Sequence, residues 1–159
     1  WVGRASVALK ALQMLGEELE GYEVIFYSCN RKILNQLNRS HSAFKSKVKA
    51  YRKHELSHHV VMDLLSKARI YIGVSLSDGI STSLLESMAM GAFPIQTSTA
   101  CVDEWFEDGR TGIAVKNLDP ASLANQIKLA SLSAQRSLPI VQQTSVETMR
   151  PVRSRFQLS

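Results

Sequence analysis

Two spacings of hydrophobic residues alternate along the chain, one typical of helices and one typical of strands. Between residues 3 and 20 apolar side chains recur three or four positions apart, with Gly21 as a C-terminal cap, which predicts a helix. Tyr22–Cys29 (YEVIFYSC) is a short β-branched and aromatic run, which predicts a buried strand. The same reasoning predicts further helices over 31–39, 57–67, 81–90 and 119–131, strands over 44–51, 69–75, 93–97 and 112–116, and one or two helical turns over 101–107.

The regular alternation of strands and helices predicts an α/β fold with a parallel sheet and helices on both faces. Two N-caps support the helix starts, Ser57 and Asp119, and Pro120 suits the first helical position. We place this domain at residues 1–135. Residues 136–159 carry four arginines, one acid and two prolines, and we expect them to form a helix or an extended arm that leaves the domain.

Length and composition are those of one globular domain. The chain has 159 residues, of which 45% are hydrophobic and 21% charged. No apolar run approaches the roughly 20 residues that span a bilayer, and no segment resembles a secretion signal. The first residue is Trp1 rather than Met, so we expect the start to be a cut. Cys29 and Cys101 have no metal-binding spacing, and we expect reduced thiols in a cytoplasmic protein.

Basic residues are concentrated between Arg31 and Lys53, where eight lysines and arginines occur without an acid. Such a stretch suits a nucleotide diphosphate, an anionic membrane surface or nucleic acid, and a solvated face of a helix and a strand is the simpler alternative. No aromatic-interleaved motif accompanies it, so we expect no nucleic-acid partner. Peripheral contact with an anionic membrane surface stays open.

One segment combines polar groups in a way that suits a ligand. After the strand over 69–75 comes a polar loop with Asp78 and Gly79, and then a helix that contains Glu86. Parallel sheets bind ligands beyond the carboxyl ends of their strands, and the free N–H groups of a helix start bind phosphate. Gly79 allows close approach of the backbone, and the two carboxylates can accept hydrogen bonds from sugar hydroxyls. The alternatives are an ordinary turn at Asp78 and a capping box, in which Ser83 and Glu86 only hold the helix start.

The surrounding sequence is similar to a known family. Asp78 and Glu86 are separated by seven positions, SMAMGAFP follows them, and Glu104 precedes the turn DGRTG at 108–112. In this combination the chain resembles, over about residues 1–130, the donor-site region of retaining glycosyltransferases of family four. The resemblance implies the C-terminal half of a GT-B fold, which is a Rossmann-like domain that binds a nucleoside diphosphate sugar.

The resemblance also implies a role for the residues of this segment. Glu86 would bind the ribose of the donor, and Asp78 would bind hydroxyls of the transferred sugar. We expect these two acids to be the residues closest to catalysis. The backbone amides of Ile80, Ser81 and Thr82 would hold the diphosphate.

Other donor-binding residues are implied by the same family pattern. Tyr51 and Arg52 would flank the nucleobase. Arg4, in the pair Gly3-Arg4, is a candidate for the diphosphate. Helical sequence follows it directly, so we expect Arg4 to lie on the first helix and the strand that precedes this helix in the family to be absent.

We expect transfer of a glycosyl group from a nucleotide sugar to an unidentified acceptor, with retention, and with no cofactor or bound metal. The acceptor would bind to an N-terminal domain, so this chain by itself would bind donor weakly without turnover. A non-catalytic sugar-nucleotide-binding or interaction module is one alternative. It is favoured by Asp78, where the family usually has glutamate, and by Ser81, where it often has glycine. A GT-B-fold sugar-nucleotide epimerase is another, but its acid and histidine set is not evident.

The histidines His54, His58 and His59 suggest one further hypothesis. His54 and His58 have the i, i+4 spacing at which a helix can bind a metal. No acid or cysteine nearby completes such a site except Glu55. We therefore favour exposed histidines at a strand end and a helix start.

Overall fold

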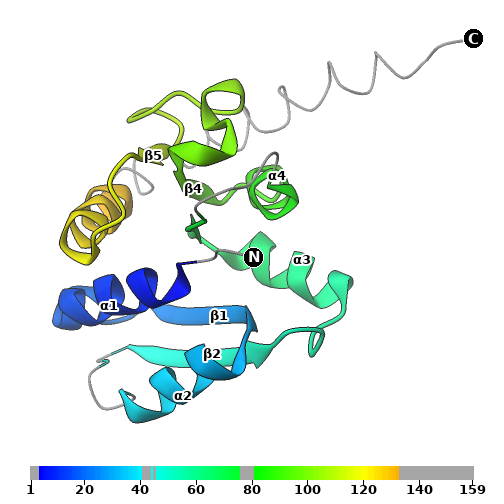
Figure 1. Ribbon diagram of the computed structural model, residues 1–159. Coiled ribbons are helices and arrows are strands. Elements are labelled where there is room, and N and C mark those ends of the chain that lie inside the picture. Colours follow the sequence, from blue (N-terminus) through cyan, green and yellow to red (C-terminus); the bar gives the residue numbers. More distant parts are fainter. Residues whose placement is uncertain (1–3, 41–43, 45, 76–80, 133–159) are drawn as a thin grey trace, which may run out of the picture.

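The structure is a computed structural model that describes residues 4–40, 44, 46–75 and 81–132 (Figure 1). Strands and helices alternate along it, as the sequence predicts. The helices are α1 (Ala5–Leu15), α2 (Arg31–Arg39), α3 (His58–Lys67), α4 (Thr82–Ala89) and the helix over residues 120–132. The strands are β1 (Glu23–Cys29), β2 (Lys47–Arg52), β3 (Ile70–Gly73), β4 (Phe93–Thr97) and β5 (Ile113–Val115). The 3₁₀ turns are η1 (Gly16–Leu19), η3 (Ser98–Ala100) and η4 (Val102–Glu104).

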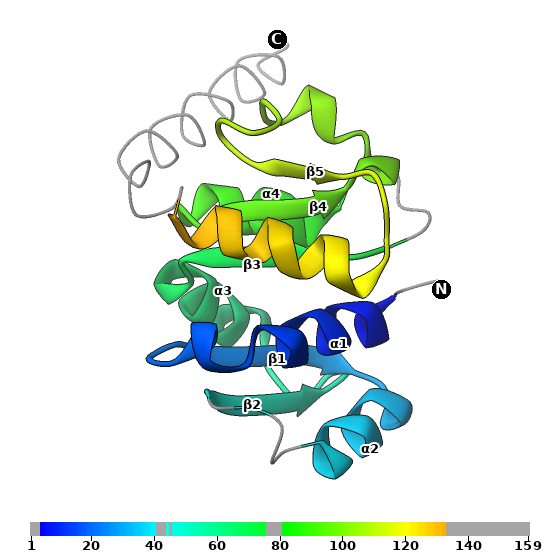
Figure 2. The same cartoon turned by 90° about the vertical axis from the view of Figure 1, so that its left-hand side faces the viewer.

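The strands form two parallel sheets. β1 pairs with β2, whereas β3, β4 and β5 form the other sheet in that order. The arrows of β1, β2 and β4 point the same way in Figure 2, so the strands of both sheets end at a common side, here called the carboxyl edge. α1 and the 120–132 helix cover one face, and α3 and α4 cover the other. The predicted α/β class with helices on both faces is confirmed, but the strands belong to two sheets.

Two hydrophobic clusters hold the helices on the sheets. On one face, Leu12 and Leu15 of α1 pack in a cluster with Ile95 of β4. On the other face, Leu84 of α4 packs in a cluster with Leu65 of α3. Burial of such apolar surface, worth about 25 cal/mol per Å², is the main favourable term in folding. The position of α4 is therefore set by its packing, and with it the position of the polar residues that α4 carries.

Capping residues place most helix ends where the sequence predicts them. The side chains of Ser57 and Asp119 each accept a hydrogen bond from a backbone N–H of the first helical turn, as N-caps do. The first helix is an exception, because the sequence predicts that it continues to residue 20. It ends at Leu15, since Gly16 adopts a φ of 48° that does not continue an α-helix, and η1 follows.

Strand boundaries differ from the predicted ones by at most three residues, at β2, which begins at Lys47 rather than at residue 44. The helical turns predicted over 101–107 are the short 3₁₀ turn η4. The predicted C-terminal arm, residues 136–159, lies outside the described residues. Within the part of the chain that the structure describes, no helix combines the length and apolar character needed to cross a bilayer.

Candidate functional site

The loop that leads from β3 to α4 is held at both ends at the carboxyl edge. At its start, the Ser75 N–H donates to the Thr97 hydroxyl at 3.3 Å, and the Thr99 hydroxyl donates to the Ser75 carbonyl at 3.0 Å. At its end, the Ser81 hydroxyl caps α4 by accepting a backbone N–H at 3.3 Å. The first turn of α4 therefore has a fixed place at the edge, where its free N–H groups suit an anion. The predicted Asp78, Gly79 and Ile80 lie outside the described residues.

Glu86 points from α4 toward α3 rather than toward the start of its own helix. Its Oε1 lies 2.8 Å from Nε2 of His58, the first residue of α3. Ser81 is the N-cap of α4, so Glu86 is not the third helical residue that a capping box requires, and Ser83 is not its cap. The capping-box alternative is therefore wrong for this helix. The Glu86 side chain is 28% exposed, which leaves its carboxylate accessible to a ligand.

A tyrosine of the other sheet reaches the same place. Tyr27, near the end of β1, hydrogen-bonds the side chains of Ser83 in α4 and Tyr71 in β3. Burial raises the pKa of the Tyr27 phenol, the Ser83 hydrogen bond lowers it, and the negative charge of Glu86 raises it; the net shift is upward. Tyr27, His58, Tyr71, Ser83 and Glu86 thus form one polar group at the carboxyl edge, here called the Glu86 cluster.

Replacement of Tyr27 by phenylalanine tests this arrangement through pH. The unfolded phenol has a pKa of about 10, and the folded pKa is higher, so the folded chain keeps a proton that the unfolded chain releases. The contribution of the phenol is complete below about pH 10 and declines as the pH rises toward the folded pKa. We expect wild type to lose stability relative to Tyr27→Phe only as the pH rises above about pH 10, measured as urea midpoints. A constant difference between the two chains would contradict the burial of this phenol.

Arg4 lies beside the end of β3. It occupies the N-cap position of α1, and its backbone N–H donates to the Val74 carbonyl at 3.1 Å. The structure thus places Arg4 at the start of the first helix, close to the prediction, and next to Ser75, where the anchored loop begins. Its side chain is exposed at this edge. A role as ligand of the diphosphate stays a prediction.

Tyr51 and Arg52 lie at the carboxyl edge, at the end of β2. Among the described strands β2 pairs only with β1. β1 therefore lies between these two residues and the residues of β3 and α4 that contact Tyr27. The Arg52 N–H donates to the Glu55 carboxylate at 2.5 Å, which closes the turn that leads to α3. The structure therefore brings these two residues to the same edge as Glu86 but not into the Glu86 cluster. Their contact with a nucleobase stays a prediction.

The three histidines lie in different surroundings. His58 contacts Glu86, whereas His54 lies in the turn before α3 with a φ of 65°. His59 is exposed. No group of three His, Cys, Asp or Glu side chains in the described ranges is placed to hold a metal ion. Cys29 is buried and Cys101 exposed, and both are free thiols.

Part of the basic stretch is neutralised by an acid that precedes it in the sequence. Glu23 of β1 lies 2.7 Å from the Lys49 ammonium and 3.8 Å from that of Lys47, both on β2. The hydrogen bond from Lys49 lowers the pKa of Glu23. The parallel pairing of β1 with β2 creates this contact. The stretch is therefore less cationic at β2 than its sequence indicates.

The residues of the DGRTG segment, which precedes β5, have contacts that account for them as parts of a turn. The Asp108 carboxylate accepts the Ala114 N–H at 2.9 Å, and Gly109 donates to the Gly112 carbonyl at 2.8 Å with a φ of 79°. A Cβ at Gly112 would lie 2.5 Å from the ring of Phe106. This part of the family pattern shapes a turn, and the ligand-type groups lie in the Glu86 cluster.

Sequence reasoning missed Tyr27 and His58 as site residues. Both lie where a parallel strand ends or where the following helix begins, and such positions share one edge of a sheet. That rule would have singled out Tyr27 at the end of its predicted strand. The partner of His58 depends on the packing of α3 against α4, which the sequence does not show.

Fold and site together define a class of protein. Ligand-type side chains gather at the carboxyl ends of parallel strands, as in Rossmann-like domains. A family model described as glycosyl transferases group 1 matches residues 1–131. The chain belongs to this family. A comparison with curated proteins found no match.

Solved structures share the fold at low sequence identity. The catalytic domain of cholesterol-α-glucosyltransferase from Helicobacter pylori has a TM-score of 0.70 at 13% identity, over 91% of this chain and 90% of that one. The pneumococcal O-GlcNAc transferase GtfA, in complex with UDP and GlcNAc, has 0.67 at 17%, over 92% and 29%. Anabaena HepE, in complex with UDP and glucose, has 0.59 at 16%, over 94% and 45%. These likenesses support the predicted GT-B architecture, and the chain spans less than half of the last two proteins.

Proposed function

We propose that this chain binds a nucleoside diphosphate sugar at the carboxyl edge and is the donor-binding half of a retaining glycosyltransferase. The observation that carries the proposal is the placement of Glu86. Its carboxylate has no capping role, stays partly exposed, and is oriented by His58 at the edge where parallel sheets bind ligands. Two structures with the same fold hold UDP together with GlcNAc or glucose, which supports a UDP sugar as the first donor to try.

In this proposal each part of the edge binds one part of the donor. Glu86 accepts hydrogen bonds from the ribose hydroxyls, and charge-assisted bonds of this kind are the stronger ones. The N–H groups of residues 80–82 and the positive end of the α4 dipole hold the diphosphate, with Arg4 adding positive charge. Asp78 accepts from hydroxyls of the transferred sugar, and Tyr51 and Arg52 flank the base. Transfer then depends on stabilising the charge of the departing diphosphate.

We place the acceptor and any general base on a separate N-terminal domain. The Glu86 cluster offers a ribose ligand and hydrogen-bonding hydroxyls, which suit binding rather than proton transfer to an acceptor. The 159-residue chain alone is therefore expected to bind donor without transferring the sugar. Release of free nucleoside diphosphate in step with glycosylation of an added acceptor would contradict this.

Calorimetric titration of the chain with nucleoside diphosphates and their sugars tests the proposed function. We expect one nucleotide series to bind with a Kd of about 1 mM or below, since the acidic and amide ligands of one half-site are present. UMP and free glucose serve as controls that lack the diphosphate or the nucleoside. No heat of binding at millimolar concentration for any base would contradict the proposal and favour a module that retained only the fold.

His58 is expected to support binding modestly. Its side chain is 73% exposed, and exposed ion pairs contribute about 0.2–1 kcal/mol. His58→Ala should therefore weaken donor binding by about 1.5- to 5-fold, because the Glu86 carboxylate loses the partner that orients it. His59→Ala, on the next residue of α3, is the matched control and should bind as wild type. Tighter binding by His58→Ala would show instead that the imidazole competes with the ribose.

A further inference from the structure

Gln96 is a buried polar side chain next to the last position of β4, and it is 1% exposed. Its neighbours across the sheet are Gly73 of β3 and Ala114 of β5, so the long side chain is flanked by positions with little or no side chain. Ala114 belongs to the cluster that holds Leu84 of α4, and paired residues of neighbouring strands share a face. The Gln96 amide therefore lies on the face that α4 covers, where the surrounding core is apolar.

The space for this amide exists because residue 73 is a glycine. A Cβ at Gly73 would collide with Oε1 of Gln96 and would lie 3.1 Å from the ring of Tyr71. The amide thus fills the place of the missing side chain, beside Tyr71. Gln96 is therefore a direct neighbour of the Glu86 cluster, to which Tyr71 belongs.

Only one end of the Gln96 amide has a partner. Nε2 lies 3.5 Å from the Thr97 hydroxyl, at the upper limit for a hydrogen bond, and Oε1 is buried without a partner in the described part of the chain. Exchanging the amide oxygen and nitrogen would leave one end unpaired in the same way. A buried polar group without a partner destabilises a fold, and a methionine of similar length would avoid this cost. Folding alone therefore does not explain an amide at this position.

A second unpaired group lies at the same end of the neighbouring strand. The Ser75 hydroxyl oxygen is also buried without a partner among the described residues, although hydroxyls of Thr97 and Thr99 hold its backbone. Parallel sheets bind ligands at this edge. A ligand hydroxyl can pair with a serine and with either end of an amide, because it both donates and accepts, whereas a phosphate oxygen only accepts. The two groups therefore suit a hydroxyl-rich ligand.

We propose that Gln96, together with Ser75, hydrogen-bonds a hydroxyl of the sugar moiety of the donor; this assignment rests on the function proposed above. The amide can turn toward the ligand at little cost, because its one bond, at 3.5 Å, is long. The hydrogen bond that the free chain lacks is made when the donor binds. Gln96 thereby distinguishes a nucleoside diphosphate sugar from the nucleoside diphosphate alone.

Gln96→Met tests this assignment through two opposite effects. In the free chain it should raise the thermal midpoint by at least about 2 °C, because a buried unpaired amide is removed. It should weaken binding of UDP-glucose or UDP-GlcNAc by about 2- to 12-fold, which corresponds to one hydrogen bond, and leave the Kd of UDP unchanged. Gln126→Met is the matched control. Gln126 also has a buried Oε1 without a described partner, on the helix that covers the opposite face, and its substitution should change neither Kd.

NMR of the Gln96 side-chain amide provides a measurement that a purely structural role would not change. Its NH₂ signals, assigned by their loss in Gln96→Met, should shift with the UDP sugar and with an excess of free glucose or GlcNAc, but not with UDP. If wild type binds neither UDP nor its sugars, the proposed function fails, and the free monosaccharides alone decide the role of Gln96. A lower thermal midpoint of Gln96→Met would show that the amide serves the fold and would overturn the assignment. An unchanged ratio of the UDP and UDP-sugar Kd values, or NH₂ signals that no sugar shifts, would also overturn it.

Discussion

Glu86→Gln is expected to weaken nucleotide-sugar binding by about 10- to 150-fold, which corresponds to the roughly 1.5–3 kcal/mol that a hydrogen bond to a charged group contributes. The substitution keeps the size of the side chain and removes the negative charge that would accept two ribose hydroxyls. The carboxylate is free for this role because Ser81 caps α4 and His58 holds only Oε1, at 2.8 Å. Calorimetric titration of both chains with the best nucleotide sugar measures the effect.

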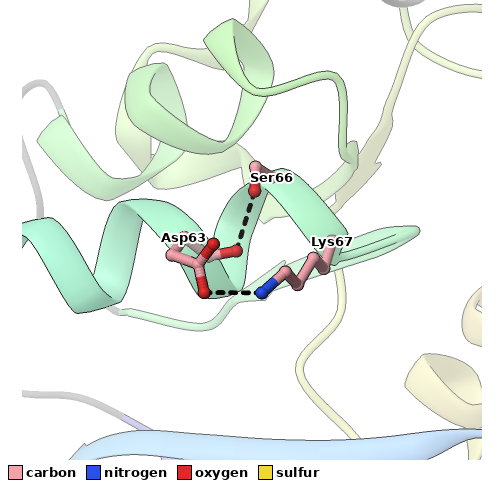
Figure 3. Close-up of polar contacts among 3 residues, drawn as sticks. All are labelled: Asp63, Ser66 and Lys67. Atoms are coloured by element: carbon pink, nitrogen blue, oxygen red, sulfur yellow. Dashed lines mark hydrogen bonds and ion pairs between the residues drawn. The ribbon is translucent and has the colours of Figure 1, made fainter.

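An acid on the neighbouring helix provides the matched control. Asp63 of α3 is exposed and lies 2.7 Å from the Lys67 ammonium, while the Ser66 hydroxyl donates to its carbonyl (Figure 3). Asp63→Asn removes one charge from the same surface but touches no residue of the Glu86 cluster. It should bind donor as wild type does. If Glu86→Gln and Asp63→Asn bind donor equally well, Glu86 is not the ribose ligand, and the proposed site is in the wrong place.

Leu84→Ala is expected to lower the free energy of unfolding by about 2–5 kcal/mol, as substitutions of fully buried leucines do. Leu84 is 1% exposed and packs in the cluster that joins α4 to α3 and β3. The cavity left by three lost heavy atoms adds to the lost transfer free energy, and the total is a large share of the roughly 5–15 kcal/mol that stabilise a domain. Urea unfolding followed by circular dichroism measures the change.

A leucine on another helix separates burial from helix propensity. Leu129 is 59% exposed on the 120–132 helix, so Leu129→Ala should change stability by no more than about 0.5 kcal/mol. Both substitutions change leucine to alanine inside a helix, and only the packing differs. If the two variants unfold at the same urea concentration, the packing of α4 described here is wrong. Because α4 carries Glu86, Leu84→Ala should also weaken donor binding when the folded fraction is still high.

Local patterns predicted most of the secondary structure. N-caps at Ser57 and Asp119 and a glycine after α4, Gly91 with a φ of 89°, mark helix ends by short-range chemistry. The end of α1 was predicted wrongly because the hydrophobic period continues through Gly16, although the backbone leaves the α-helix there. Strand lengths depend on which neighbour supplies hydrogen bonds, so the pattern placed them only approximately.

The candidate site was predicted in part. The acidic pair and the loop before α4 follow from a combination of residues close in sequence, so the resemblance to a family reaches them. His58 and Tyr27 are 28 and 59 positions away from Glu86, and no local rule joins residues at such separation. The choice between a capping box and a free carboxylate at Glu86 was likewise open, since Ser81 and Ser83 are both suitable caps.

Periodicity, capping residues and the family pattern determined the α/β class, the order of the elements and the segment that would bind the donor. These properties depend on interactions between residues that are close in sequence, so the sequence alone predicts them. Tertiary structure decided that Glu86 faces His58 and that Tyr27 reaches the same cluster from another sheet. It also decided that the strands form two sheets, with β1 and β2 in one and β3, β4 and β5 in the other. Each of these depends on the packing of helices across sheets, where residues distant in sequence compete for the same buried space and the same hydrogen bonds.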